Sequence, residues 1–305
     1  MRFGGHETFA IREGWLHKGL RLLLEEPRLL DDEFVADHLG VGRNMAKSIL
    51  YWLHATRLAE FNTGTHAHLW THSPSELGRL VWSHDPYFNH IGTWWALHIE
   101  LVRNKPHAYA WDWFFNSFAS QRFDRTLCID RLSRTLRLSQ ARIPTQKTLQ
   151  REIAVLLHTY ARVVPPPTGD PEDAQECPFA DLRLLTLFAD TGSYRLNDQP
   201  RRDIPFEVIA YSFSAAFPQF AGPETSAEGV TIREAITEPS GPGRVLGLSE
   251  ASLFELLVEH EARRPGDLGL SALGGERLVR LRPKPPLFWL KAYYDALEQG
   301  AAIAS

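Results

Sequence analysis

The sequence predicts a mainly α-helical protein with small β-hairpins, in which tandem winged-helix or helix-turn-helix units surround a helical core. Residues 31–72 follow a helix, turn, helix and hairpin pattern, and residues 126–160 show a second helix–turn–helix pattern. Residues 111–118 form a dense aromatic run at helical spacing, which favours a buried central helix. These segments together define the expected fold.

The first unit combines signals for two short helices with signals for a hairpin. Carboxylates at residues 31–33 favour a helix start, because the exposed N–H groups of a helix N-terminus attract negative charge. The glycines on either side of Val41 predict a tight turn, and a second helix is expected over residues 43–55. Strand and turn signals over residues 58–72 predict a wing.

The second helix of this unit is expected to have two different faces. The apolar face comprises Met45, Ile49, Trp52 and Leu53. The opposite face carries hydrogen-bonding groups and one cation without any carboxylate, and comprises Asn44, Lys47, Ser48 and Tyr51. A helix that lies in the major groove of DNA needs this kind of surface. A packing or protein-docking module with the same elements is the alternative.

A second helix–turn–helix unit is expected further along the chain. Residues 126–136 and 145–160 show helical spacing, and Thr145 is a good N-cap for the second helix. The outer face of that helix carries amides and cations, which suit base edges and phosphates, although a solvated polar face has the same composition. The residues expected to contact DNA are Arg12, Lys18, Arg43, Asn44, Lys47, Tyr51, Lys147, Gln150 and Arg151.

The net charge of −4 is unevenly distributed along the chain. Residues 1–165 hold 20 Lys and Arg against 16 Asp and Glu, whereas residues 166–305 hold 13 against 21. Residues 122–162 alone contain nine cations and three carboxylates. An anionic polymer such as double-stranded DNA is therefore expected to meet the first half, and the acidic half is expected to meet protein, with a homodimer as the simplest assembly.

The composition predicts three domains and one linker. We expect a winged-helix domain over residues 1–82, a helical domain with the second helix–turn–helix over 83–164, a proline-rich linker over 165–177, and an acidic helical domain over 178–305. Within the last domain, residues 178–188 and 204–217 are expected to be buried helices. Its final part is expected to hold a helix capped by Ser249 and then a hairpin around Gly274 and Gly275, which together predict a third winged-helix-like unit. A terminal helix is expected over residues 287–297.

The sequence shows neither a signal peptide nor an apolar run long enough to span a bilayer. Its two cysteines, Cys128 and Cys177, are far apart and form no metal or redox motif, which favours a reducing cytoplasm. Phosphate-binding loops, paired CxxC motifs and nucleophile elbows are also missing from the sequence. Any catalytic chemistry must therefore come from less specific groups.

His6 and Glu7, in the N-terminal segment, are the best candidates for catalysis and for binding a metal. A carboxylate beside an imidazole can hold a divalent ion, such as Mg²⁺ or Mn²⁺, or activate water for attack on phosphorus. The alternative is that both residues only pin the segment to the winged-helix unit. A second histidine group, His66, His68 and His72, shares one side of the expected wing, where it can hold a metal or touch phosphates.

Three stretches resemble one bacterial family catalogued as a domain of unknown function. They are residues 3–9 (FGGHETF) with Arg12 and Trp15, residues 145–153 (TQKTLQREI) and residues 243–248 (GRVLGL). The family includes the SspB-type proteins of Ssp DNA phosphorothioation systems, which serve in phage defence. The resemblance implies a DNA nickase that works with a cysteine desulfurase, an ATPase and an ATP-pyrophosphatase-like protein. It does not imply which residues cut.

These observations together predict a cytoplasmic DNA-binding protein that nicks one strand, with a divalent ion assisting hydrolysis. The competing hypothesis is a non-catalytic DNA-binding subunit or a transcription regulator. The groove-facing helices fit both hypotheses equally well, because they indicate binding and not chemistry.

Overall fold

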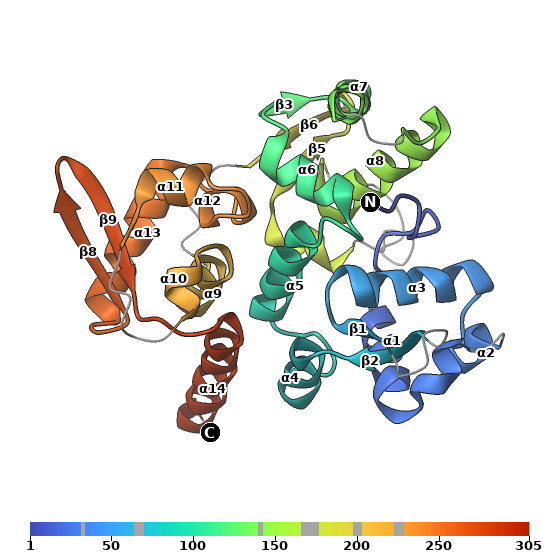
Figure 1. Cartoon of the computed structure of the whole chain (residues 1–305), viewed down its shortest axis with the longest axis horizontal. Helices are drawn as coiled ribbons and strands as arrows, with labels where there is room; N and C mark the ends of the chain where they lie inside the picture. Colours follow the sequence, from blue (N-terminus) through green and yellow to red (C-terminus); the bar gives the residue numbers. More distant parts are fainter. Residues whose placement is uncertain are drawn as a thin grey trace. The chain divides into compact units, whose positions relative to one another are not determined.

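The computed structural model describes residues 1–31, 34–63, 70–139, 143–165, 177–197, 203–222 and 229–304 (Figure 1). The chain forms two compact units, Met1–Leu196 and Asn197–Ser305, and is mainly helical with small β-sheets. The expected domain boundary at residue 82 and the expected linker over 165–177 both fall inside the first unit. In the part of the chain described, no helix is long and apolar enough to cross a membrane.

The first unit begins with the elements expected for its N-terminal part. Helix α1 (Trp15–Glu25) and the 3-10 turn η1 (Pro27–Asp31) precede α2 (Val35–Leu39) and α3 (Arg43–Ala55). Strand β1 (Ala59–Thr63) then pairs antiparallel with β2 (Trp70–Pro74). Gly40 ends α2 in the left-handed conformation with φ of 62°, which a glycine adopts without strain. The predicted second helix is confirmed over its full length.

The core of this unit is built around the aromatic helices that follow. Helices α4 (Glu76–His84), α5 (Ile91–Arg103) and α6 (Tyr109–Ser117) succeed one another in the chain. Trp94 and Trp95 on α5 and Trp111 and Trp113 on α6 are buried, whereas Trp82 on α4 is half-buried. The prediction that residues 111–118 form a central core helix is confirmed.

Helices α7 (Arg125–Leu138) and α8 (Gln146–Tyr160) match the predicted second helix–turn–helix. Both have the expected kind of start, because the side chains of Asp124 and Thr145 accept N-capping hydrogen bonds from the backbone N–H groups of Leu127 and Thr148. The Arg125 guanidinium donates to the carbonyl of Gln150 at 2.8 Å and ties the two helices together.

A four-stranded sheet completes the first unit and was not predicted. Its order is β3 (Arg122–Phe123), β6 (Ser193–Leu196), β5 (Leu185–Phe188) and β4 (Ala161–Val164), with β4 parallel to β5. The prediction of a helix over residues 178–188 is wrong beyond the short turn η2 (Pro178–Leu182), because Arg183 turns left-handed with φ of 52°. Residues 185–188 then pair with strands on both sides, and this long-range pairing outweighs local helix preference.

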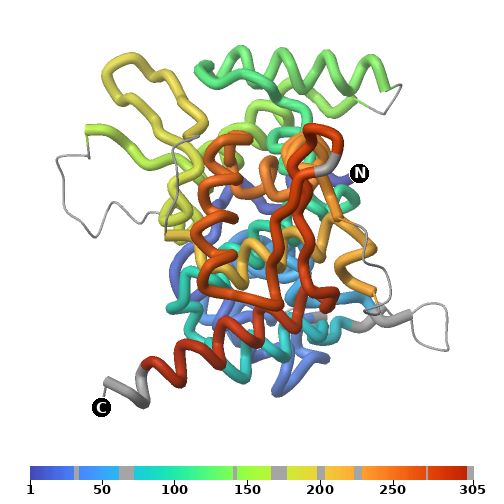
Figure 2. The backbone as a smooth tube through the Cα atoms, turned by 90° about the vertical axis from the view of Figure 1, so that its left-hand side faces the viewer, coloured from blue at the N-terminus to red at the C-terminus, as the bar shows by residue number. Residues whose placement is uncertain are grey.

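The second unit is also helical, with one small sheet. Its helices are α9 (Phe206–Ala216), α10 (Pro218–Ala221), α11 (Ile232–Thr237), α12 (Pro242–Val245), α13 (Glu250–Arg263) and α14 (Pro286–Ala304). Strands β8 (Leu268–Leu273) and β9 (Glu276–Leu281) form the predicted hairpin, which Figure 2 shows side by side, and β7 (Val230–Thr231) pairs with β9. The Ser249 hydroxyl accepts from the N–H of Ser252, which confirms the predicted cap of α13. The terminal helix is also confirmed; its Trp289 indole donates to Ser214 on α9 at 3.0 Å.

Candidate nucleic-acid interface

The N-terminal segment is clamped against α8 by a buried hydrogen-bonded pair. His6 and Glu152 are both fully buried, and His6 Nε2 lies 3.0 Å from Glu152 Oε2. Because His6 Nδ1 accepts from the N–H of Thr8 at 3.2 Å, the ring proton of a neutral imidazole is on Nε2 and is donated to Glu152. The same carboxylate oxygen accepts from the N–H of Gly4 at 2.7 Å. The pair therefore anchors the segment to α8, whereas the pinning alternative placed the anchor on the expected winged-helix unit.

The segment also packs on α3, and glycine at position 5 allows this close approach. A Cβ atom at Gly5 would lie 2.4 Å from Cδ2 of Tyr51, closer than any side-chain contact permits. The His6 ring packs edge-on against Tyr51, with centroids 5.7 Å apart, and against Trp111, at 6.1 Å. In Figure 1 the N-terminal loop lies between α3 and α8.

This docking corrects the predicted outer face of α3. Tyr51, expected to contact DNA, has an exposed fraction of only 3% and donates its hydroxyl to the carbonyl of His107 at 3.2 Å. Burial, and then the nearby Glu152 carboxylate, raise the pKa of Tyr51 well above its usual value. Ser48 is buried as well. The N-terminal segment covers the second half of α3, which the helical spacing within α3 does not reveal.

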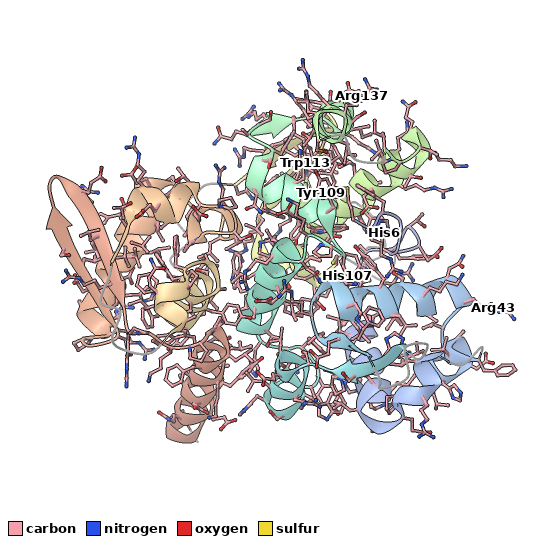
Figure 3. All side chains as sticks on the ribbon, viewed as in Figure 1. His6, Arg43, His107, Tyr109, Trp113 and Arg137 are labelled. Atoms are coloured by element: carbon pink, nitrogen blue, oxygen red, sulfur yellow. The ribbon has the colours of Figure 1, made fainter. Side chains whose placement is uncertain are left out.

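The first half of α3 remains open to solvent. Arg43, Asn44 and Lys47 are exposed, and Figure 3 shows Arg43 at the outer end of the helix. Two other predicted contacts, Arg12 and Lys18, are also exposed. The Arg12 guanidinium lies over the rings of Phe9 and Trp15, at 5.5 and 5.6 Å from their centroids. These cations are accessible to a phosphate backbone.

Helix α8 divides cleanly into a buried and an exposed face. The residues predicted to point inward are buried: Leu149, Ile153, Leu156 and Tyr160. The residues predicted to point outward are exposed: Gln146, Lys147, Gln150 and Arg151. One residue departs from the prediction, since the charged Glu152 is buried by its contacts with His6 and Gly4. Helical spacing places Glu152 three residues after Leu149 and four before Leu156, at the side of the buried face, but gives no sign of its partner His6.

Glu7 differs from its neighbour His6 in both burial and backbone. It is half-buried, and its backbone is left-handed with φ of 49°, followed by Thr8 with φ of 75°. The turn is closed by hydrogen bonds from Glu7 N–H to the Gly4 carbonyl and from Phe9 N–H to the His6 carbonyl. Consecutive non-glycine residues in this conformation cost free energy and persist only when surrounding contacts hold them. The His6–Glu152 pair is such a contact.

The predicted histidine group of the wing is only partly described. His66 and His68 lie outside the described residues, and His72 Nδ1 lies 2.7 Å from Nε2 of His54. His54 also stacks on Phe61 with ring centroids 3.9 Å apart. Burial, and then His72, lower the pKa of His54 to about 3. His54 is thus a neutral partner of His72 on β2 at physiological pH.

Comparison with known proteins places this geometry in a family. The sequence profile described as "Protein of unknown function (DUF4007)" matches residues 3–294. The chain belongs to the DUF4007 family. A magnesium-bound SspB crystal structure is similar with a TM-score of 0.84 and 25% identity, covering 96% of this chain and 88% of that one. A second SspB crystal structure has a TM-score of 0.82 at the same identity and coverage. No curated protein matches the sequence.

The magnesium in one of these SspB structures raises the question of which groups of this DUF4007 chain suit such an ion. Mg²⁺ in proteins is usually held by one or two carboxylates together with water and substrate phosphates. Glu7 supplies a carboxylate of this kind, whereas both ring nitrogens of His6 are already engaged. Within the described ranges, no group of three or more His, Cys, Asp or Glu side chains is arranged to hold a metal.

Thiol chemistry is disfavoured in this chain. Cys128 and Cys177 are both buried and free, and burial raises the pKa of each thiol to about 12. A thiolate is the reactive form of cysteine, so both side chains are inert near neutral pH. Neither is suited to carry sulfur.

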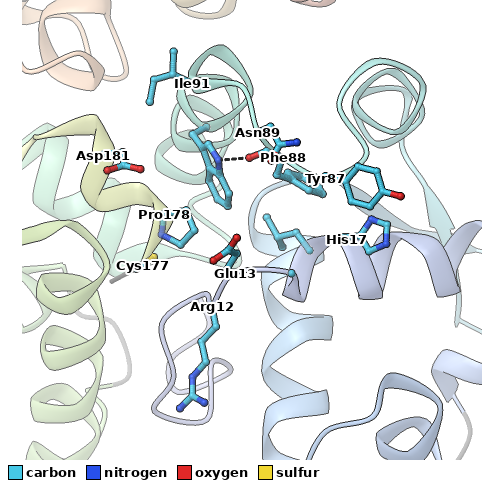
Figure 4. A pocket seen from close by; sticks show the side chains of 13 residues that line it. Arg12, Glu13, His17, Tyr87, Phe88, Asn89, Ile91, Cys177, Pro178 and Asp181 are labelled. Carbon is cyan, nitrogen blue, oxygen red and sulfur yellow. Dashed lines mark hydrogen bonds between the residues drawn. The ribbon is translucent and has the colours of Figure 1, made fainter. Parts of the chain in front are cut away.

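A cavity of about 390 Å³ opens beside α1 and α5 (Figure 4). Its wall includes the carboxylates of Glu13 and Asp181 and the stacked rings of His17 and Tyr87, whose centroids are 4.7 Å apart. Figure 4 shows the Arg12 side chain pointing away from the other labelled groups. Two carboxylates facing one cavity repel phosphate, so the hollow is a poor phosphate site even though Arg12, a candidate DNA contact, belongs to its wall.

Proposed function

We propose that this protein binds double-stranded DNA and nicks one strand during phosphorothioate modification of DNA by an Ssp system. The observation that carries the proposal is the likeness to SspB structures along 96% of the chain at 25% identity. The expected partners are the cysteine desulfurase, the ATPase and the ATP-pyrophosphatase-like protein of such a system, with the acidic second half as their docking region or as a homodimer contact.

The proposed DNA contacts use two winged-helix-like or helix–turn–helix units. The order α1, α2, α3 and the β1–β2 hairpin is that of a winged helix, in which α3 is the recognition helix. Its exposed Arg43, Asn44 and Lys47, together with Lys147, Gln150 and Arg151 on α8, form the proposed contact surface. Amides suit base edges and cations suit phosphates, so the two helices supply both kinds of contact. Arg12 and Lys18 extend this surface.

The proposed chemistry is hydrolysis of one phosphodiester. A water oxygen bonds to phosphorus, one P–O bond breaks, and the strand ends carry a phosphate and a hydroxyl. Glu7 is our candidate to hold a divalent ion such as Mg²⁺ or Mn²⁺, or to take the proton of the attacking water. When bound, such an ion would supply positive charge for the phosphoryl oxygens and acidify water. His6 acts in this proposal as a positioning residue, because its nitrogens are committed to Glu152 and Thr8.

The direct test is a nicking assay on supercoiled plasmid with the purified full-length protein. Conversion to open circles that requires Mg²⁺ or Mn²⁺ and leaves little linear product would support the proposal. A mock preparation from cells that lack the protein controls for contaminating nucleases. Plasmid that stays supercoiled, with and without the partner proteins, would overturn nicking while leaving DNA binding open.

A non-catalytic DNA-binding subunit or transcription regulator is the second candidate. Two observations favour it. Polar faces of α3 and α8 are exposed, and the residues described include no group of three or more side chains arranged to hold a metal. Tight, salt-dependent DNA binding without nicking, even in the presence of all partners, would select this candidate.

A further inference from the structure

Two large apolar side chains are exposed where α7 ends and α8 is about to begin. Leu138 is the last residue of α7, and 79% of its surface is exposed. Ile143 lies two residues before the Thr145 cap of α8 and is 45% exposed. Only four residues separate them, so both belong to the same end of this helix pair. We call Leu138 and Ile143 the α7–α8 tip.

The packing of α7 directs Leu138 away from the core. The buried side chains on this helix are Cys128, Leu132 and Leu136. Leu138 follows Leu136 by two residues, a rotation of about 200° around a helix, and so faces the opposite side. The rotation of α7 is fixed because the Trp113 indole donates to Thr135 Oγ1 at 3.0 Å. Leu138 therefore cannot be tucked into the core without turning the helix.

In the stretch of chain around the α7–α8 tip, every charged residue is a cation. From Arg131 to Arg151 the sequence contains six Lys and Arg residues and not one Asp or Glu. Among them, Arg134 and Arg137 on α7 and Lys147 on α8 are exposed, and Figure 3 shows Arg137 at the outer edge of the first unit. An apolar protein partner would have to desolvate these cations, whereas a nucleic acid would neutralise them with phosphates.

The combination of apolar and cationic groups points to one mode of DNA contact. Architectural proteins insert apolar side chains between base steps and hold the flanking phosphates with cations, which unstacks and bends the duplex. We propose that Leu138 and Ile143 form a wedge that enters bound DNA between stacked bases, while Arg134, Arg137 and Lys147 hold the phosphates around it. This inference rests on the proposed DNA binding, and adds that the protein deforms the duplex that it cuts.

Permanganate oxidation tests the wedge, because it attacks unstacked thymines wherever the protein binds. The full-length protein is titrated onto linear duplex DNA at several salt concentrations, and bound complexes are treated with permanganate. Wild-type protein should create reactive thymines. The double variant Leu138→Ser, Ile143→Ser should reduce this reactivity by roughly tenfold at saturation, with the salt dependence of binding unchanged because no cation is lost. Val258→Ser is the matched control, since Val258 is 46% exposed on α13 in the second unit.

The outcomes separate the wedge from the proposed function. Salt-dependent binding without any reactive thymine overturns the wedge alone, and so does full reactivity in the double variant. Absence of DNA binding by wild-type protein overturns the proposed function together with the wedge. Sedimentation of the same proteins tests whether the α7–α8 tip instead contacts a second copy of the chain. Loss of self-association in the double variant, with thymine reactivity intact, would assign the tip to that contact and overturn the wedge.

Discussion

The buried imidazole of His6 donates to the buried carboxylate of Glu152 at 3.0 Å, across 146 residues of sequence. The second oxygen of this carboxylate, Oε1, has no hydrogen-bond partner in the part of the chain described. Hydrogen bonds from His6 and from the N–H of Gly4 therefore compensate the negative charge of this buried carboxylate. The pair links the N-terminal loop to α8, while the Tyr51 contact links the same loop to α3.

Removal of one member of this pair should be strongly destabilising. His6→Ala is expected to lower the free energy of unfolding by roughly 3–5 kcal/mol, because it leaves the buried carboxylate of Glu152 without its partner. Glu152→Ala is expected to cost roughly 1–3 kcal/mol, because it leaves a buried neutral imidazole unsatisfied. Urea titration followed by circular dichroism measures this. Glu7→Gln should change stability by less than about 0.5 kcal/mol, since Glu7 is outside the buried pair. A His6→Ala protein as stable as wild type would contradict the anchoring role.

The exposed half of α3 should contact DNA, and its buried half should not. Lys47→Ala is expected to weaken binding about uniformly across sequences and to reduce the slope of log affinity against log salt by roughly one, as loss of one phosphate contact does. Gel-shift titrations at several salt concentrations give both quantities. Tyr51→Phe should leave DNA affinity unchanged, because the hydroxyl donates to the His107 carbonyl. Unchanged binding by Lys47→Ala together with weaker binding by Tyr51→Phe would assign the DNA contact to Tyr51 and not to Lys47.

The exposed face of α8 should act together with α3 on one duplex. Replacement of Lys147, Gln150 and Arg151 by alanine should lower DNA affinity by roughly 100-fold or more, because linked contacts act through a high effective concentration. Arg233→Ala, which removes one exposed cation on α11 of the second unit, is the control and should bind as wild type. Fluorescence anisotropy with a labelled duplex checks this. Equal losses in the two proteins would show a general charge effect.

Local patterns predicted the helices well because their signals are local. The Thr145 cap and the spacing of Leu149, Ile153 and Leu156 suffice to define α8 and its inner face. The burial of Glu152 and Tyr51 is different, because a segment more than forty residues away in sequence covers them. The β5 strand was missed for a similar reason, since its partners β4 and β6 fix its conformation. The candidate contacts on exposed helix faces were thus predictable, and the clamp that organises them was not.

The protein should lose stability in mild acid because of His54. Burial, followed by His72, His107 and Arg2, lowers the pKa of His54 to about 3. A hydrogen bond involving the backbone of Ala59 has a smaller effect that raises this pKa. Between pH 6.5 and 3 the unfolded state binds a proton that the folded state does not, so stability falls as pH falls. The expected slope from this residue is roughly 1 kcal/mol per pH unit below pH 6.5.

Thermal unfolding from pH 7.5 to pH 4.5 measures that dependence. His54→Phe should make the curve flatter below pH 6.5, since phenylalanine can still stack on Phe61 and cannot be protonated. His158→Gln, at an exposed position of α8, is the control and should retain the wild-type slope. An unchanged slope in His54→Phe would assign the acid sensitivity to other groups.

Glu7 should be needed for nicking and dispensable for folding and binding. Glu7 is half-buried in a left-handed turn that the His6–Glu152 pair holds, and it is not a member of that buried pair. Glu7→Gln keeps the size and hydrogen-bonding capacity of the side chain and removes its charge. Because loss of a general base or of a metal-binding carboxylate removes transition-state stabilisation, nicking should fall by at least about 100-fold. DNA affinity should stay within about threefold, a shift below 1 kcal/mol. Rates on supercoiled plasmid and anisotropy on the same preparations give the two numbers. Nicking by Glu7→Gln at the wild-type rate, with Mg²⁺ present and after chelation, would remove this residue from the chemistry while leaving the anchoring of His6 intact.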